Sequence, residues 1–299
     1  MISSLFFYII SSLLFSNISW PVLNLENHGQ VIKRWETESF GQRLKEMETL
    51  DLSAHSVAVL DLDSDFFVFE KNSDESLPIA SISKLMSALV FMDLDIDFDA
   101  YYKIKQDDRR LGGRDYLFLG EEVKNIDLLA LALIASDNTA VIALISSSGI
   151  SEEEFVSRMN EKAKEMKLYK TYFEDPTGLS YKNVSSAKEV ALIAREALSR
   201  KEIVDLSRLY EYSFETKNGR KKNINSTNEL LLGLKDTGIK GNVIAGKTGY
   251  NDLAGYCLSL DFSLEGGQKF ISVVLNSSSI KNRFLDTEKI AEKIDSIYK

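Results

Sequence analysis

Three short motifs with the residue types of a serine enzyme occur in order along the chain. Residues 81–84 read Ser-Ile-Ser-Lys, residues 136–138 read Ser-Asp-Asn, and residues 247–249 read Lys-Thr-Gly. Residues three apart share one face of a helix, so the hydroxyl of Ser81 can meet the amine of Lys84. A serine activated by an adjacent base is a nucleophile for acyl transfer. We therefore predict a serine enzyme that uses lysine where most serine hydrolases use histidine.

Each motif alone is a weak signal, because similar spacings recur elsewhere in the chain. Ser-x-x-Lys also occurs at Ser185 and at Ser278, and Ser-x-Asn also occurs at Ser226. Only the ordered set is informative. Its members lie far apart in sequence, so the fold, and not the local sequence, must bring them together.

The first motif gives the two groups that start the reaction. We predict Ser81 as the nucleophile and Lys84 as its general base. A free lysine has a pKa of about 10.4, so a base that works near neutral pH needs a pKa about 3 units lower. Burial and a second cation both disfavour the protonated amine. Lys247 is the candidate for that second cation.

The second motif supplies groups for the leaving side of an acyl transfer. Ser136 and Asn138 follow an apolar run over residues 128–135, which places them where two helices meet and face a cleft. Ser136 can relay a proton to a leaving amine. Asn138 can hold both Lys84 and a substrate amide, because a carboxamide accepts and donates hydrogen bonds.

The third motif suits a substrate with a terminal carboxylate. It lies near the start of a strand-rich tail, where an edge strand can pair with a peptide. Lys247 and Thr248 offer a positive charge and a hydroxyl to the carboxylate. Gly249 has no side chain, so the substrate backbone can approach closely.

Composition limits the classes of partner. The chain has 299 residues, 44% of them hydrophobic, with a formal net charge of −9 and a pI near 5.0. This hydrophobic content is enough for a buried core and argues against disorder. The acidic balance argues against nucleic acid as a partner, because no net positive field would attract phosphates.

Few residues are available for metal or redox chemistry. His28 and His55 are the two histidines, which excludes a zinc site built on several histidines and favours lysine over histidine as the base. Cys257 is the single cysteine, so we expect no intrachain disulfide and a small apolar residue in a strand. Alternating acids over residues 93–99 lack the Gly and Glu of an EF-hand loop. We expect neither a metal nor a cofactor.

The beginning of the chain predicts export. Residues 1–21 contain an apolar run over residues 5–15 and are expected to form a signal peptide or an N-terminal membrane anchor. The alternative is that these residues form a buried apolar segment of the folded protein. Residues 22–50 are expected to be a linker or a peripheral helix, and residues 51–299 the catalytic domain. The protein is then exported to the outer face of the cytoplasmic membrane, the periplasm or the cell wall.

The first half of the predicted catalytic domain changes from strand to helix. Residues 57–60 and 66–69 flank an acidic turn and predict a β-hairpin. Apolar residues at helical spacing then predict a buried helix that opens at Ser81. The apolar run over residues 126–145 is expected to be helical. A further helix is expected to begin at Ser151, with a capping box.

The second half returns to strand. Residues 255–263 and 270–275 predict two strands, and an amphipathic helix is expected around residues 290–297. Strands at both ends of the chain with helices between them indicate the α+β class. We therefore expect one antiparallel sheet built from both chain ends and flanked by helices.

The ordered motifs form the signature set of penicillin-binding proteins and class A β-lactamases. From about residue 56 to residue 286, the chain resembles the D-alanyl-D-alanine carboxypeptidase family of low-molecular-weight penicillin-binding proteins. Four stretches carry this resemblance: residues 78–81 (Pro-Ile-Ala-Ser), 173–180 (Phe-Glu-Asp-Pro-Thr-Gly-Leu-Ser), 225–231 and 246–257. The resemblance implies a β-lactamase/transpeptidase-like fold with a helical subdomain.

The resemblance also implies the reaction. A peptidoglycan peptide ending in D-Ala-D-Ala acylates Ser81, D-alanine leaves, and water hydrolyses the ester; β-lactams are covalent inhibitors. A carboxypeptidase and a D,D-endopeptidase both fit these motifs. The backbone N–H groups of Ser81 and Tyr250 are expected to form the oxyanion hole, a device that contributes about 3 to 4 kcal/mol. Arg283 is expected to assist recognition of the carboxylate.

The sequence departs from the family pattern, and two rival functions stay open. Asp137 stands where the family most often has Gly, as in the Ser-Asp-Asn of class A β-lactamases. Glu174 suggests the deacylation loop of such a lactamase, but Gly178 stands where that loop needs Asn. The alternatives are a class A-like β-lactamase and a catalytically silent cell-wall-binding or scaffold protein.

Arg283 lies close to the end of the sequence. We therefore expect no C-terminal β-domain and no C-terminal amphipathic anchor of the kind that many carboxypeptidases have. Membrane attachment is then expected to come from residues 1–21. This expectation slightly favours the endopeptidase over the carboxypeptidase.

Overall fold

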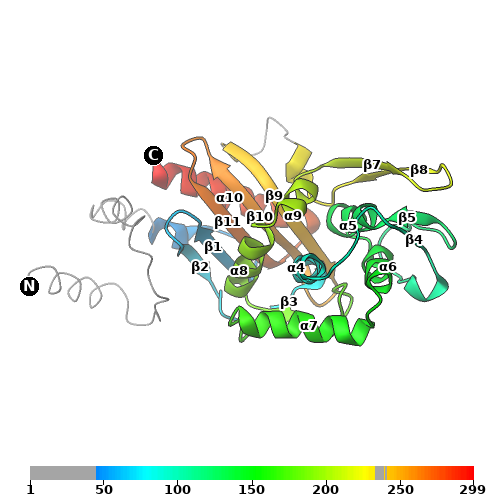
Figure 1. Ribbon diagram of the computed structural model, residues 1–299. Helices are drawn as coiled ribbons and strands as arrows, with labels where there is room; N and C mark the ends of the chain where they lie inside the picture. The colour runs from blue at the N-terminus through cyan, green and yellow to red at the C-terminus, as the bar shows by residue number, and fades with distance from the viewer. Residues whose placement is uncertain (1–44, 233–238, 240) are drawn as a thin grey trace, which may run out of the picture. The chain divides into compact units, whose positions relative to one another are not determined.

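The computed structural model describes residues 45–232, residue 239 and residues 241–299 (Figure 1). The predicted signal peptide or anchor over residues 1–21, and most of the predicted linker over residues 22–50, lie outside this part of the chain. Within it, no helix combines the length and the apolar character needed to cross a bilayer.

A five-stranded antiparallel sheet contains strands from both ends of the sequence (Figure 1). Its order is β2-β1-β11-β10-β9. The strands are β1 (Ser56–Asp61), β2 (Phe66–Lys71), β9 (Gly241–Asn251), β10 (Gly255–Leu264) and β11 (Lys269–Ser277). β1 pairs with β11 so that Ser56 lies opposite Leu275. The predicted hairpin and the predicted closure of the sheet by both chain ends are confirmed.

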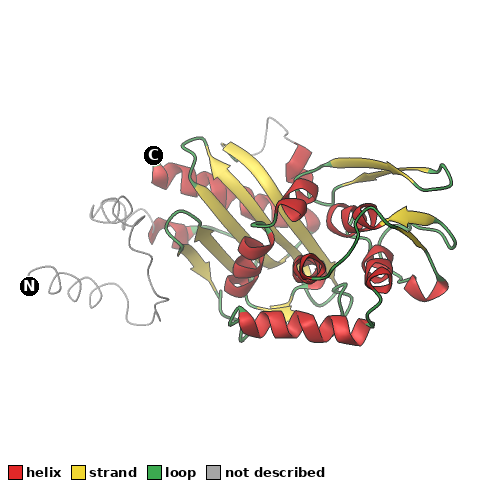
Figure 2. Ribbon diagram, in the orientation of Figure 1, coloured by secondary structure: helices red, strands yellow, loops and turns green. Residues whose placement is uncertain are grey.

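Helices cover both faces of this sheet, as Figure 2 shows. α8 (Ala187–Ala197) packs against β1 and β11, and α10 (Ile280–Tyr298) packs against β10 and β11. In Figure 1 α8 lies in front of the sheet and α10 behind it. All six residues of β1 are buried, because a strand covered on both faces has no solvent side.

A group of helices beside the sheet forms the predicted helical middle. It comprises α4 (Lys84–Asp93), α5 (Asn125–Ile134), α6 (Asn138–Ser148), α7 (Glu152–Glu165) and α9 (Lys201–Ser207). α4 packs against α5, α7 and α8. Its apolar residues therefore face neighbours on every side, and eight of its ten residues are buried. This central position fixes α4, which carries Lys84 at its first turn.

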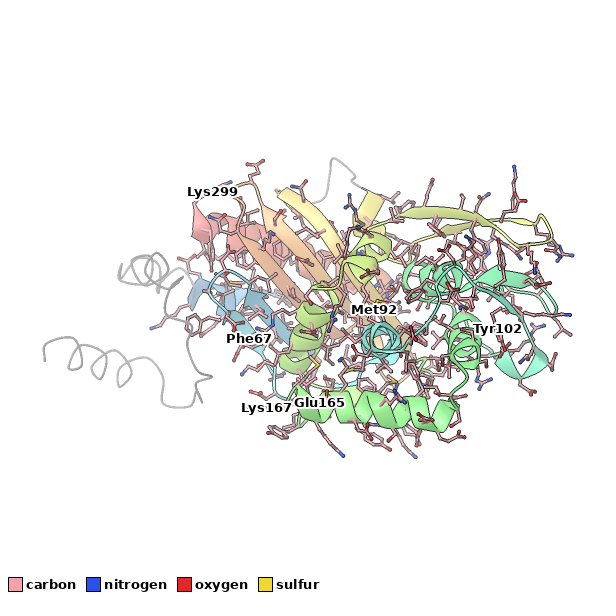
Figure 3. All side chains as sticks on the ribbon, viewed as in Figure 1. Phe67, Met92, Tyr102, Glu165, Lys167 and Lys299 are labelled. Carbon is pink, nitrogen blue, oxygen red and sulfur yellow. The ribbon has the colours of Figure 1, made fainter. Side chains whose placement is uncertain are left out.

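Short elements connect these layers. Three small antiparallel sheets pair β3 (Leu77–Pro78) with β6 (Val184–Ser185), β4 (Tyr101–Lys103) with β5 (Glu122–Lys124), and β7 (Glu211–Glu215) with β8 (Lys221–Asn225). The 3-10 helices are η1 (Glu46–Thr49), η2 (Ala80–Ser83), η3 (Gln106–Asp108) and η4 (Glu229–Leu232). On β4, the hydroxyl of Tyr102 (labelled in Figure 3) donates to Asp108 Oδ1 at 3.1 Å. Ser146 Oγ of α6 donates to the same oxygen at 2.8 Å, so this carboxylate ties β4 to α6.

The helix predicted to open at Ser81 begins three residues later. Ser81 lies in η2, and the α-helix starts at Lys84. Ala80, immediately before the serine, has a φ of 47°, a left-handed conformation that the start of a regular α-helix does not allow. The backbone at Ser81 therefore differs from the predicted α-helix, whereas the three-residue spacing still brings Ser81 and Lys84 together.

The apolar run over residues 126–145 is divided into two helices at the second motif. Ser136 has a φ of 60°, which ends α5 and turns the chain. Asp137 then caps α6 by accepting a hydrogen bond from the Ala140 N–H at 2.7 Å. The predicted position of Ser136 and Asn138 at a helix junction is confirmed.

The capping box predicted at Ser151 is half formed. Ser151 Oγ accepts a hydrogen bond from the Glu154 N–H at 3.1 Å. The Glu154 carboxylate instead pairs with Arg158 at 2.7 Å, because a partner four residues along the helix is within reach.

Candidate active site

Ser81 and Lys84 meet at the junction of η2 and α4. Lys84 Nζ lies 3.1 Å from Ser81 Oγ. The same nitrogen donates to Asn138 Oδ1 at 2.7 Å and to the Thr177 carbonyl at 2.6 Å. The Lys84 side chain is 1% exposed. A buried amine is thus held beside the hydroxyl by contacts from two other parts of the chain.

The pKa of the Lys84 amine lies near neutral pH. Burial lowers the pKa of Lys84 from 10.5 to about 7, while the carboxylates of Asp175 and Asp137 oppose this fall. Desolvation disfavours the charged form of an amine, whereas a nearby carboxylate favours it. Of the two predicted causes of the depressed pKa, burial lowers the pKa of Lys84, and the charge of Lys247 is not among the influences on it.

Lys247 reaches the second serine of the site. Its Nζ donates to Ser136 Oγ at 2.8 Å and to the Thr248 carbonyl at 3.0 Å. Burial, and then the positive charges of Lys84 and Arg283, lower the pKa of Lys247 well below its ordinary value. The Coulomb repulsion between the two lysines is mutual, so it disfavours the state in which both amines are positively charged. The predicted second cation is therefore near Lys84.

Thr248 continues the site along β9. Its Oγ1 lies 2.6 Å from Thr227 Oγ1, and either hydroxyl can donate. The Thr227 N–H in turn donates to the Ile134 carbonyl at the end of α5 at 3.1 Å. This connection holds the strand and the helical part together beside the second motif.

Two glycines allow the backbone around the serine to pack closely. A Cβ on Gly249 would lie 2.7 Å from the Ile79 carbonyl oxygen, so β9 and η2 touch through backbone atoms. A Cβ on Gly178, whose φ is 85°, would lie 2.1 Å from the Ala80 carbonyl oxygen and 2.7 Å from the Ser81 nitrogen. Both positions need glycine because real Cβ contacts are not that short.

Tyr250 follows the third motif near the end of β9. The ring is half exposed, stacks on Tyr256 with centroids 4.4 Å apart, and donates its hydroxyl to Asp252 at 3.0 Å. Among the described residues, β9 is the outermost strand of the sheet, so one of its edges has no partner strand there. η2 packs against this strand.

Arg283 is buried behind β9. Its side chain lies between the sheet and α10, at 4.7 Å from the Phe284 ring centroid, and Nη1 lies 3.4 Å from the Gly249 carbonyl. Burial lowers the pKa of the guanidinium. The residue is 5% exposed. The structure therefore places it against the backbone of the third motif.

The loop over residues 173–183 belongs to the site, and its role was missed in the sequence. Asp175 Oδ1 accepts hydrogen bonds from the Thr177 N–H at 2.7 Å and the Gly178 N–H at 2.9 Å. Asp175 Oδ2 accepts from the Ser180 N–H at 2.7 Å. The Asp-Pro-Thr-Gly sequence is a recognisable turn, which was a usable signal. The carboxylate shapes the loop that presents the Thr177 carbonyl to Lys84.

Asn138 also connects the site to a second loop. Its Nδ2 donates to the Leu111 and Gly112 carbonyls, each at 3.3 Å. Since Oδ1 accepts from Lys84, the carboxamide orientation is fixed from both ends. No sequence motif indicated this loop, because it contributes backbone oxygens to the site. Within the described ranges, no group of three or more His, Cys, Asp or Glu side chains is placed to hold a metal ion.

Comparisons with known proteins extend across nearly the whole described chain. Residues 43–279 match the family Peptidase S11, described as D-alanyl-D-alanine carboxypeptidase. The chain is 33% identical to the D-alanyl-D-alanine carboxypeptidase DacF of Bacillus subtilis, over 85% of this chain and 65% of that protein. It is also 33% identical to a D-alanyl-D-alanine endopeptidase of Haemophilus influenzae, over 80% of this chain and 81% of that protein.

Solved structures share the fold. A Streptomyces DD-transpeptidase superimposes with a TM-score of 0.75 at 23% identity, covering 82% of this chain and 98% of that one. A D-alanyl-D-alanine carboxypeptidase of Mycobacterium tuberculosis gives a TM-score of 0.71 at 23% identity, covering 81% and 92%. The predicted β-lactamase/transpeptidase-like architecture is confirmed. The chain spans 65% of the length of the Bacillus relative.

Proposed function

Because the chain belongs to the D-alanyl-D-alanine carboxypeptidase family, we propose that it is a serine-type D-Ala-D-Ala peptidase that acts on peptidoglycan stem peptides. The observation that carries the proposal is the 3.1 Å contact between Ser81 Oγ and a buried Lys84 amine with a pKa of about 7. About half of the molecules with this pKa carry a neutral amine at pH 7, and that form can accept a proton.

Acylation begins at Ser81. Lys84 in its neutral form accepts the hydroxyl proton while Oγ attacks the carbonyl carbon of the penultimate D-alanine. The negative charge that develops on the carbonyl oxygen is stabilised by the backbone N–H groups of Ser81 and Tyr250. The contact of η2 with β9 at Gly249 supports this pairing, since it brings the two backbones side by side.

The leaving group needs a proton as the C–N bond breaks. Ser136 is suited to deliver it, because its hydroxyl is held by Lys247 Nζ at 2.8 Å. The proton passes from the Ser136 hydroxyl to the departing amine, and the lysine ammonium replaces it. D-alanine, or the amine of a cross-linked peptide, then leaves. The proton that Lys84 took from Ser81 then passes to the now neutral Lys247, which makes Lys84 a free base again. Water attacks the ester carbonyl and gives a proton to Lys84, and Lys84 returns this proton to Ser81 Oγ as the ester bond breaks.

The strand β9 is proposed to position the substrate. The peptide pairs in extended form with the free edge of the strand, Asn138 binds its amide, and Gly249 allows the close approach. Lys247 and Thr248 bind the terminal carboxylate, and Arg283 holds the Gly249 carbonyl and adds its positive charge. β-lactams acylate Ser81 by the same attack and remain as covalent inhibitors.

The substrate also sets the place of action. Relatives named as D-alanyl-D-alanine peptidases support a location outside the cytoplasm, where cross-linked peptidoglycan is found. We retain residues 1–21 as the proposed export signal or membrane attachment, and residues 51–299 as the proposed catalytic domain.

Two measurements test the proposal. Purified protein is incubated with a pentapeptide and with cross-linked dimeric muropeptides, and the products are identified by mass. Free D-alanine indicates the carboxypeptidase, and split dimers indicate the endopeptidase. Intact substrates would contradict the proposed function, and rapid nitrocefin hydrolysis would support a β-lactamase in its place.

Covalent labelling tests the nucleophile separately. Ser81→Ala is expected to abolish labelling by fluorescent penicillin. Ser278→Ala is the matched control, since Ser278 starts another Ser-x-x-Lys sequence and its hydroxyl contacts Asn282. Labelling that persists in Ser81→Ala would overturn the assignment.

A further inference from the structure

A basic cleft lies between residues 114–118 and strand β8. Its volume of about 340 Å³ falls at the lower end of the range of small-ligand pockets. Its lining includes four cationic and two aromatic side chains, namely Arg114, Tyr116, Phe118, Arg220, Lys221 and Lys222. The backbone bond from the Lys217 N–H to the Glu122 carbonyl at 2.9 Å ties the β7–β8 hairpin to β5, beside which it lies in Figure 1.

The basic cleft carries excess positive charge in a chain whose formal net charge is −9. Asp115 is the one acidic residue among those that line it, and Arg109 lies 3.6 Å from that carboxylate. Behind the lining, the buried Glu121 pairs with Lys222 at 2.9 Å and with Arg220 at 3.1 Å. Two acidic groups therefore face more cations than they can balance.

Two cations of the basic cleft stay available for a ligand. Arg114 and Lys221 form no ion pair with any other residue that the structure describes. Arg114 lies 5.3 Å from the ring centroid of Tyr116, and this cation–π contact orients the guanidinium while leaving its N–H donors free. Lys222 lies 4.6 Å from the Phe118 ring centroid. A planar, oriented guanidinium binds carboxylates through two parallel hydrogen bonds.

One wall of the basic cleft is joined to the second motif. The Tyr116 carbonyl accepts a hydrogen bond from Lys222 at 2.8 Å, and the Tyr116 backbone lowers the pKa of Asp137 in the second motif, against the larger effect of burial. Asn138 binds the Leu111 and Gly112 carbonyls a few residues earlier in the same loop. The loop that lines the cleft is therefore the loop that holds the proposed amide-binding side chain.

The other wall is joined to the third motif. β8 runs from Lys221 to Asn225 and leads directly to Thr227, whose hydroxyl contacts Thr248. Both walls thus extend from residues proposed to bind substrate. Lys247 and Thr248 are assigned to the terminal carboxylate, on the leaving side of the scissile bond. We therefore expect the acyl side of the peptide to lie beside Asn138.

We propose that the basic cleft is a subsite for a side-chain carboxylate on the acyl-side residues of the stem peptide. Arg114 binds the carboxylate in a bidentate manner, and Lys221 adds a second positive charge. This subsite makes the enzyme prefer peptides with a free acid over those with an amidated side chain. The inference rests on the proposed function for the identity of the ligand.

The test uses two synthetic peptides that end in D-Ala-D-Ala. The residue before D-Ala-D-Ala has a four-carbon side chain that ends in a carboxylate in one peptide and in a carboxamide in the other. Binding to the Ser81→Ala variant is measured by calorimetry, so no turnover is needed. We expect about tenfold tighter binding of the carboxylate peptide at low salt, and a smaller difference at high salt because solvent ions screen the attraction.

Charge-neutral variants then locate the effect. Arg114→Gln with Lys221→Gln, added to Ser81→Ala, is expected to weaken binding of the carboxylate peptide to the level of the carboxamide peptide and to leave the latter unchanged. Lys164→Gln, on the exposed side of α7, is the control and should change neither affinity.

Three outcomes would overturn the subsite. The first is equal affinity of the two peptides for the Ser81→Ala protein. The second is an equal loss of affinity for both peptides in the variant with Arg114→Gln and Lys221→Gln. The third is binding of poly(glycerol phosphate) in the cleft by a protein that binds the two peptides equally. The proposed function fails independently, namely when wild-type protein releases no D-alanine and takes up no fluorescent penicillin.

Discussion

The carbonyl oxygen of Thr177 lies 2.6 Å from Nζ of Lys84. The amine that is proposed to activate Ser81 is therefore positioned by a loop that comes 93 residues later in the chain. The Asp175 carboxylate shapes this loop by accepting three backbone N–H bonds at distances below 3 Å. Its negative charge also raises the pKa of Lys84 against the effect of burial. Asp175 is thus a positioning residue for the lysine.

Asp175→Asn is expected to lower the free energy of unfolding. It is also expected to lower the pH at which the acylation rate reaches half of its maximum. The amide cannot accept every backbone bond of the carboxylate, which costs about 1 to 3 kcal/mol. Loss of the negative charge lets the pKa of Lys84 fall further. The pH profile of penicillin labelling should therefore move to lower pH, whereas Asp74→Asn, an exposed acid paired with Lys188, should leave the profile in place. An unchanged profile in Asp175→Asn would contradict the electrostatic role.

Acylation of wild-type protein is expected to depend on pH through Lys84. Below its pKa of about 7 the amine is protonated and cannot accept the Ser81 proton. The labelling rate should then rise about tenfold per pH unit and level off above pH 7. Second-order rates with fluorescent penicillin between pH 5 and pH 9 give the curve. A rate that stays flat across this range would exclude Lys84 as the base.

Lys84→Met should abolish acylation and change the pH dependence of stability. The pKa of Lys84 is about 7 in the folded chain and 10.5 without the influence of the fold. Between these values the unfolded chain binds more protons, so wild-type protein gains stability as pH rises through this window. The variant lacks this gain. Urea titrations at pH 6.5 and pH 9.5 should show the wild type improving relative to Lys84→Met, and a constant difference would refute the burial effect.

Gly178→Ala is expected to disrupt the site. Its Cβ would lie 2.1 Å from the Ala80 carbonyl oxygen, so the backbone on either side must move. Gly149→Ala is the matched control, because its φ of 80° is similar but nothing lies within 4 Å of its added Cβ. Gly149→Ala should lower the free energy of unfolding by about 1 to 2 kcal/mol, because alanine disfavours this backbone conformation. Gly178→Ala should cost more and lose penicillin labelling, and equal effects of the two substitutions would contradict the packing argument.

Local sequence patterns predicted most of the fold. The β1–β2 hairpin, the helix that carries Lys84, and the helix junction at Ser136 follow from the spacing of apolar residues, which each element needs in order to bury one face. The β7–β8 hairpin was not anticipated. Its residues alternate between buried and exposed, but Lys222 is one of the buried ones, and a lysine among polar neighbours gives no signal of burial.

The candidate site was predictable in its side chains and not in its backbone. Hydrogen bonds of the Lys84 amine join it to Ser81 and Asn138, and Lys247 binds Ser136. The residue types and spacing of these side chains had marked them. The Thr177 carbonyl could not be foreseen, because every residue has a carbonyl and only the fold decides which one faces the lysine. The burial of Arg283 was likewise invisible, since it depends on how α10 packs against the sheet.

The two left-handed residues of the site, Ala80 and Ser136 with φ of 47° and 60°, have a consequence for how the enzyme loses function. Neither residue prefers this conformation, and each costs about 1 to 2 kcal/mol relative to a regular one. The surrounding tertiary contacts must therefore impose it. Catalytic competence is therefore lost as soon as these contacts loosen, even where the rest of the fold persists.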